Sequence, residues 1–147
     1  DLDLPSPFGA LDTTAYRDEQ LPYWTNVWSS SVALAHFTRA HAPLLTGKTV
    51  AELGCGLGVA TLPAPPSCNE LILTDQQPEA LLFARLSHLR NQRLDPITYR
   101  MDWPSPHLGN TPAILVAADA VYEERAFAPL SESSARLLPS GGAVWIA

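Results

Sequence analysis

A glycine-rich loop preceded by an acid is the first feature of this chain that could carry chemistry. The stretch ELGCGLG begins at Glu52, and its glycines alternate at Gly54, Gly56 and Gly58. Glycine lets a backbone turn sharply and approach a ligand closely, and a helix that follows points its positive end at the same spot. A dinucleotide fingerprint, GxGxxG, requires glycine where this chain has Val59. Taken alone, the motif leaves open both a ligand-binding loop and a plain tight turn.

Acidic residues follow three further apolar stretches. Asp75 comes after ELILT, and an acid there can accept two hydrogen bonds from a ribose diol. Asp102 and Trp103 follow ITYRM, where an acid can accept from an exocyclic amine and a ring can frame a purine. Asp119 and Tyr122 lie at and after the end of AILVAAD. Each could instead be a helix cap or a packed ring, but their succession in this order favours a ligand site.

The elements that must position these residues alternate along the chain. We expect five apolar strands, at residues 48–53, 70–75, 97–101, 113–119 and 141–147. We expect helices starting at Ser29 or Ser30, over 56–62 with a stop at Pro63, over 78–92 and over 124–138. This alternation predicts an α/β fold, a Rossmann-like, doubly wound and mostly parallel sheet with helices on both faces. Ligands bind such sheets beyond the carboxyl ends of the strands, where the residues above lie.

Composition limits the function classes. The 147 residues suit one domain, which we place at residues 23–147 behind an N-terminal arm of residues 1–22. The net charge is −6 and no Lys/Arg run is present, which argues against nucleic acid and against an anionic membrane surface as partners. No apolar run is long enough to span a bilayer and no signal peptide is visible, so a cytoplasmic location is expected.

No metal site is expected. The two cysteines, Cys55 and Cys68, form neither a disulfide framework nor a CxxC pair, and HExxH is absent. The four histidines have no ligand-like spacing and are interpreted as surface or structural residues: His36, His41, His88 and His107.

The motifs together resemble a class I (seven-β-strand) S-adenosylmethionine-dependent methyltransferase over about residues 20–147. VAELGCGLGVATLPA resembles the glycine-rich motif of that family, LILTDQQPEAL the acidic motif, MDW the adenine-side motif and ILVAADAVYEERAFAPL the motif after the fourth strand. With VWSSSVALAHF, the chain is similar to a subgroup that contains non-histone protein-lysine methyltransferases and nicotinamide-N-methyltransferase-like proteins. The family's sheet has seven strands, so the sixth and seventh are expected to be missing from a domain that ends at Ala147.

The resemblance implies a role for each motif residue. It implies S-adenosylmethionine as cofactor and S-adenosylhomocysteine as product. Cofactor contacts are implied for Trp28 at the amino-acid end, Glu52, Gly54, Gly56 and Gly58 at the methionine part, Asp75 at the ribose, and Asp102 and Trp103 at the adenine. Asp119 and Tyr122 would face the methyl acceptor as catalytic residues. Of the other rings, Trp24 is expected in the core, and Tyr23 is open between the core and the acceptor pocket.

The implied reaction is in-line transfer of a methyl group to the nitrogen of a protein lysine side chain. A small-molecule amine remains open as the acceptor, and so does a cofactor-binding module without turnover. A nicotinamide-dependent oxidoreductase is a further alternative, which Val59 disfavours. The acceptor's identity and the oligomeric state are not readable from these residues.

Overall fold

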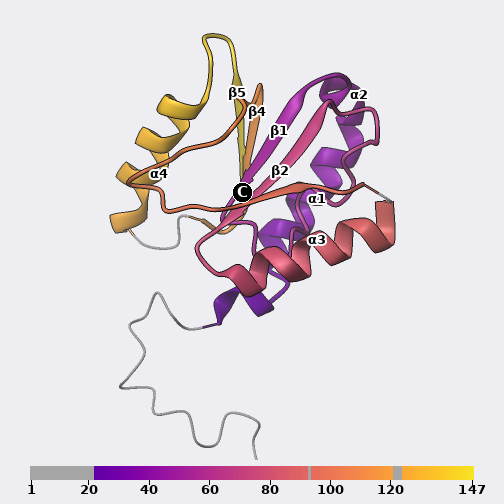
Figure 1. The fold of residues 1–147 in the computed structure, drawn as a ribbon, viewed down its shortest axis with the longest axis horizontal. Coiled ribbons are helices and arrows are strands. Elements are labelled where there is room, and N and C mark those ends of the chain that lie inside the picture. The colour runs from indigo at the N-terminus through magenta and orange to yellow at the C-terminus, as the bar shows by residue number, and fades with distance from the viewer. Residues whose placement is uncertain (1–21, 93, 121–123) are drawn as a thin grey trace, which may run out of the picture.

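The computed structural model describes residues 22–92, 94–120 and 124–147. In this part of the chain, five strands form one parallel sheet in the order β3-β2-β1-β4-β5 (Figure 1). The strands are β1 Thr49–Leu53, β2 Glu70–Asp75, β3 Ile97–Arg100, β4 Ile114–Ala117 and β5 Ala143–Ile146. The predicted α/β class and parallel sheet are confirmed. Residues 1–22, interpreted as an arm, lie outside the described residues except for Pro22. Tyr122 also lies outside them.

Strand β1 lies at the centre of the sheet, where the strand order reverses. The chain passes from β1 outward to β2 and β3, and then returns to the other side of β1 with β4 and β5. Glu52 is in register with Leu73 of β2 and with Val116 of β4. The carboxyl ends of these three strands therefore meet at one edge, at the switch point where open parallel sheets bind ligands.

Helices cover both faces of the sheet, as predicted. They are α1 Ser29–Ala40, α2 Ala42–Leu45, α3 Pro78–Gln92 and α4 Glu124–Leu137, with a short 3-10 helix, η2, at Tyr23–Thr25. One buried core joins Leu34 of α1 and Leu81 of α3 to the sheet, and the opposite core contains Leu130 of α4. Figure 1 shows α4 on one side of the sheet and α1 and α3 on the other. Among the described helices, none combines the length and the apolar character that a bilayer crossing requires.

The helix predicted over residues 56–62 is wrong. The segment between β1 and β2 folds into consecutive turns, in which the Gly58 N–H donates to the Cys55 carbonyl (2.7 Å) and the Ala64 N–H to the Thr61 carbonyl (2.8 Å). An α-helix would need donors four residues beyond the carbonyls at positions 59 and 61. Those donors are missing because Pro63 and Pro65 have no N–H.

The start of α1 also differs from the prediction. The N-cap is Trp28, which makes no side-chain capping bond, and both candidate serines lie inside the helix. Ser31 hydrogen-bonds back to the Trp28 carbonyl through its Oγ (2.7 Å). The hydroxyls of Ser29 and Ser30 are therefore not used as caps.

Candidate active site

A cavity of about 950 Å³ opens at the carboxyl ends of the strands. Its wall consists of the loops after β1, β2, β3 and β4, the segment before α1 with that helix's first turn, and part of α4. Most of the predicted site residues line it: Trp28, Glu52, Gly54, Gly56, Asp75, Asp102, Trp103 and Asp119. The fold thus gathers into one wall residues that are spread over more than half of the sequence.

The three glycines of the loop after β1 serve two purposes. All three have a positive φ, of 62° at Gly54, 49° at Gly56 and 70° at Gly58, which residues with a side chain rarely adopt. Gly54 and Gly56 line the cavity. Gly58, predicted as a cofactor contact, is buried and is not among the lining residues. A Cβ there would come within 3.1 Å of the Ala84 Cβ, so Gly58 allows the loop to lie against α3.

Glu52 forms part of the cavity wall from a buried position. Its side chain is 2% exposed, and Oε2 accepts hydrogen bonds from both the backbone N–H (3.2 Å) and the hydroxyl of Thr61. Burial raises the pKa of Glu52 to about 7, although the two Thr61 bonds act in the opposite direction. A carboxyl with such a pKa is sensitive to any charge that enters the cavity.

Asp75 joins the end of β2 to the glycine loop. Its Oδ2 accepts the N–H of Gly56 and its Oδ1 accepts the N–H of Gln77, both at 2.9 Å. Burial raises the pKa of this carboxyl, while the backbone donors hold it down. Each oxygen keeps a further lone pair. The side chain therefore orients the loop and can still accept hydrogen bonds from a diol in the cavity.

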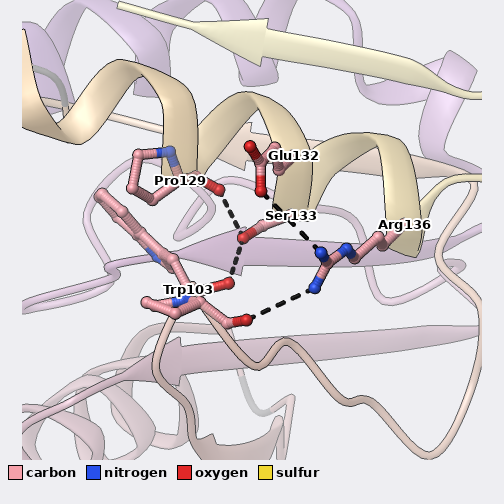
Figure 2. A network of polar contacts seen from close by, with 6 residues as sticks. Trp103, Pro129, Glu132, Ser133 and Arg136 are labelled. Carbon is pink, nitrogen blue, oxygen red and sulfur yellow. Dashed lines mark hydrogen bonds and ion pairs between the residues drawn. The ribbon is translucent and has the colours of Figure 1, made fainter.

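Helix α4 holds the loop that carries Asp102 and Trp103 (Figure 2). The Ser133 hydroxyl lies 2.6 Å from both the Trp103 and the Pro129 carbonyl oxygens. Arg136, which pairs with Glu132 at 3.9 Å, donates to the Pro104 carbonyl at 3.4 Å. The Trp103 ring packs beside Gly54, where a Cβ would lie 3.4 Å from its edge. Asp102 remains exposed at the cavity wall.

Asp119 has a left-handed backbone, with φ of 54°. Among the described residues it is the one residue other than glycine with a positive φ. Its N–H donates to the Ala147 carbonyl (2.9 Å), so the end of β5 holds this conformation in place. Asp tolerates the left-handed region better than most residues, but the conformation still costs free energy, and such costs concentrate at functional sites.

The aromatic segment before α1 lies at the cavity mouth. Trp28 is 41% exposed, lines the cavity, and donates from Nε1 to the Tyr23 carbonyl (3.2 Å). Tyr23 also lines the cavity. The prediction that Trp24 lies in the core is wrong, because it is only partly buried and lines the cavity. Its ring instead packs against Phe83 on the exposed side of α3, with 5.7 Å between centroids.

The first turn of α1 contributes residues that the sequence reasoning missed as ligand contacts. Ser29, Ser30 and Ser31 all line the cavity. The Ser30 hydroxyl is buried and has no hydrogen-bond partner within the described part of the chain. Free backbone N–H groups at a helix start favour an anion. The sequence feature that could have indicated these contacts is the run of three serines at the start of a helix. Such serines can bind a carboxylate ligand as well as cap the helix.

The charge of the cavity is one-sided. Four carboxyl side chains line it, those of Glu52, Asp75, Asp102 and Asp119, and its described wall contains no Lys, Arg or His. Such a wall attracts cations and repels the pyrophosphate of a dinucleotide. The first turn of α1 belongs to the same wall and contains no acidic residue, so the positive end of this helix suits an anion.

Comparison with known proteins gives consistent similarities. Residues 17–147 match the model of a family described as lysine methyltransferase. The electron transfer flavoprotein beta subunit lysine methyltransferase homolog of Caenorhabditis elegans is 31% identical over 80 residues. That match covers 53% of this chain and 33% of the relative. The chain therefore corresponds to only part of the relative's length.

Solved structures share the fold at low identity. The ribosomal protein L11 methylase from Lactobacillus delbrueckii subsp. bulgaricus has a TM-score of 0.66 at 18% identity, over 82% of this chain and 61% of that one. Coclaurine N-methyltransferase, bound to N-methylheliamine and S-adenosylhomocysteine, has a TM-score of 0.64 at 15% identity. That match covers 83% of this chain and 38% of the enzyme. At these identities the similarity concerns the fold.

Proposed function

The chain belongs to the lysine methyltransferase family, and on this premise we propose that it binds S-adenosylmethionine and methylates the side-chain nitrogen of a protein lysine. The observation that carries the proposal is the cavity at the strand ends, whose charged side chains are all carboxylates. Both the sulfonium of the cofactor and the ammonium of a lysine are cations. The nicotinamide alternative is disfavoured by Val59, which stands where a dinucleotide fingerprint has its third glycine.

The donor set of the cavity fits this cofactor. The unpartnered Ser30 hydroxyl and the start of α1 suit the carboxylate of its amino-acid end, and Trp28 lies beside them in the wall. The free lone pairs of Asp75 suit a ribose diol. Asp102 can accept from an exocyclic amine, and the Trp103 ring offers an apolar surface for a purine. Gly54 and Gly56 allow the backbone to come close, because they have no side chain.

When bound, S-adenosylmethionine supplies a methyl group on a sulfonium leaving group. The chain's own task is then mainly to align the two partners and to exclude water, since proximity and orientation lower the barrier of such a transfer. The cavity wall offers glycine-loop backbone and aromatic rings for this task. The remaining requirement is an acceptor nitrogen that has lost its proton.

Asp119 is the residue that we assign to the acceptor. It lines the cavity, and its left-handed backbone is held by the end of β5. A carboxylate at this place attracts the lysine ammonium and, once the ammonium has released its proton to water, orients the neutral amine through a hydrogen bond. Tyr122 lies outside the described residues, and its role toward the acceptor is proposed on the resemblance alone.

Calorimetry tests the cofactor assignment. Titration of the folded protein with S-adenosylmethionine, S-adenosylhomocysteine and NAD should give binding heat with the first two compounds and none with NAD. Absence of heat with both sulfur compounds, from protein shown by circular dichroism to be folded, would reject the proposal. Incubation with methyl-labelled S-adenosylmethionine and a cell extract identifies the acceptor class. Label in protein supports a lysine acceptor, whereas label confined to small molecules supports the amine alternative.

A matched pair of variants tests the role of Asp119. Asp119→Asn removes the charge and keeps a residue that tolerates a positive φ. We expect turnover to fall by about 100-fold or more, a magnitude typical of positioned acid–base groups, with cofactor affinity within about threefold. The control, Glu79→Gln, removes an equal charge from the exposed first turn of α3, away from the cavity lining, and should change neither value. Equal loss of turnover and of cofactor affinity in Asp119→Asn would reject the acceptor role.

We also propose a cytoplasmic location. Cys55 and Cys68 are both free, and both are buried. Unpaired thiols are typical of proteins from reducing compartments. Fractionation of source cells followed by immunodetection tests this location.

A further inference from the structure

His88 is a buried polar side chain that touches the glycine loop but does not line the cavity. It lies on α3 and is 0% exposed. Its Nε2 is 3.1 Å from the Gly58 carbonyl oxygen and 3.5 Å from the Thr61 Oγ1. Its Nδ1 has no hydrogen-bond partner among the described residues. Neither the proposed cofactor contacts nor the acceptor residue accounts for this arrangement.

These contacts determine the proton position on the ring. A carbonyl oxygen can only accept, so Nε2 must carry the hydrogen that is donated to Gly58. Nδ1 is then a bare lone pair, and the ring is neutral. A second proton on Nδ1 would bury an N–H without an acceptor together with a positive charge. Burial accordingly lowers the pKa of His88.

The ring is connected through Thr61 to the cavity wall. The Thr61 hydroxyl donates to Oε2 of Glu52, which leaves an oxygen lone pair as a second, longer acceptor (3.5 Å) for the single Nε2 hydrogen of His88, beside the Gly58 carbonyl (3.1 Å). The hydrogen-bond donors therefore follow one direction: His88 on α3 donates toward Thr61, and Thr61 donates to Glu52, which lines the cavity. The loop lies close against the imidazole ring, since a Cβ at Gly58 would be only 3.2 Å from Nε2 of His88.

We propose that His88 is a positioning residue for the cofactor-binding loop. Its Nε2–H holds the Gly58 carbonyl and orients the Thr61 hydroxyl onto Glu52, so that the loop and the carboxyl keep the shape that receives the cofactor. The inference rests on the proposed function, because it specifies how the same site is kept in place. His88 itself does not touch the cavity.

The proton position can be measured without any cofactor. Nitrogen-15 NMR of the free protein should show His88 as the Nε2-protonated neutral tautomer. The resonance should stay unchanged as the pH falls well below the ordinary histidine pKa of about 6.5. The Nδ1-protonated tautomer, or titration near pH 6.5, would overturn the proposal. His36, which is exposed, provides the comparison within the same spectrum.

A pair of amide substitutions separates positioning from general packing. The side-chain amide nitrogen introduced by His88→Gln reaches about as far as Nε2, whereas the one introduced by His88→Asn reaches only as far as Nδ1. With both variants held at a temperature where near-ultraviolet circular dichroism shows them folded, His88→Gln should bind S-adenosylhomocysteine within about threefold of the wild type. His88→Asn should lose about tenfold or more, the effect of leaving a buried carbonyl without its donor. Equal affinities in the two variants would overturn the proposal.

A second pair covers the case in which His88→Asn does not fold. Thr61→Ser keeps the hydroxyl, and Thr61→Val keeps the shape without it. Affinity should be retained with Ser and fall by about tenfold with Val, and retention in both would again overturn the proposal. If instead the folded wild type binds neither sulfur compound, the proposed function fails and the inference fails with it. If the wild type binds S-adenosylhomocysteine and the two variants of each pair bind it equally well, the inference about His88 is rejected while the proposed function stands.

Discussion

Glu52 offers a quantitative test of how the site is built, because the folded protein holds its carboxyl almost without access to water. Its pKa is about 7 in the folded chain in place of 4.5, and desolvation is the main cause. The folded state therefore keeps a proton on this group over a pH range in which the unfolded chain has released it. Unfolding then releases a proton, so the contribution of Glu52 to stability falls as the pH rises from about 4.5 to 7.

The expected size follows from the two pKa values. One pKa unit corresponds to about 1.4 kcal/mol, and the change that falls between pH 5 and pH 8 is about 2–3 kcal/mol. Asp75 shifts in the same direction and His88 in the opposite one, so the wild-type pH profile alone does not isolate Glu52. Glu52→Gln keeps an oxygen for the two Thr61 donors and removes the titration. The difference between the two proteins contains the Glu52 contribution.

Urea denaturation of the cofactor-free protein at pH 5 and at pH 8 measures this difference. Relative to Glu52→Gln, the wild type should lose about 2–3 kcal/mol of unfolding free energy between the two pH values, or about 1–2 M in urea midpoint. If the wild type and Glu52→Gln instead differ by less than about 0.5 kcal/mol in the unfolding free energy that each loses between pH 5 and pH 8, that outcome would show that water or an ion reaches the carboxyl. That result would refute the interpretation of Glu52 as a desolvated wall residue.

Three further expectations concern the loop, the aromatic segment and the core. Gly56→Ala should lower the unfolding free energy by about 1 kcal/mol in urea denaturation, because φ of 49° strains any residue with a side chain, although the added methyl only reaches the Trp24 carbonyl at 3.4 Å. Trp28→Ala should weaken S-adenosylhomocysteine binding in calorimetry more than Trp24→Ala does, whereas Trp24→Ala should lower the melting temperature more, since its ring packs on Phe83. The reverse order would contradict both assignments. Leu115→Ala removes a fully buried side chain of β4 and should cost about 2–5 kcal/mol of unfolding free energy in urea denaturation, and an unchanged urea midpoint would be the contrary result.

The order of the elements and the position of the site could be predicted from the sequence. Strand β2 and helix α3 begin and end at the predicted residues, because a short apolar run bounded by Asn69 and Asp75 and a helix opened by Pro78 leave few alternatives. The strand-end acids belong to the same local pattern. In a parallel sheet every strand's carboxyl end lies at one edge, so the succession of such residues predicts a shared wall.

The tertiary structure alone decided how individual residues are used. Two predicted cofactor contacts show this: Gly56 lines the cavity while Gly58 packs against α3, although both are glycines with a positive φ in one short loop. The left-handed backbone of Asp119 is accompanied by a hydrogen bond from its N–H to Ala147, the residue after β5. Likewise, His88 differs from the other histidines only through the loop that lies against it. Local patterns determine which residues reach the sheet edge, whereas burial and partners from distant segments determine what each can do there.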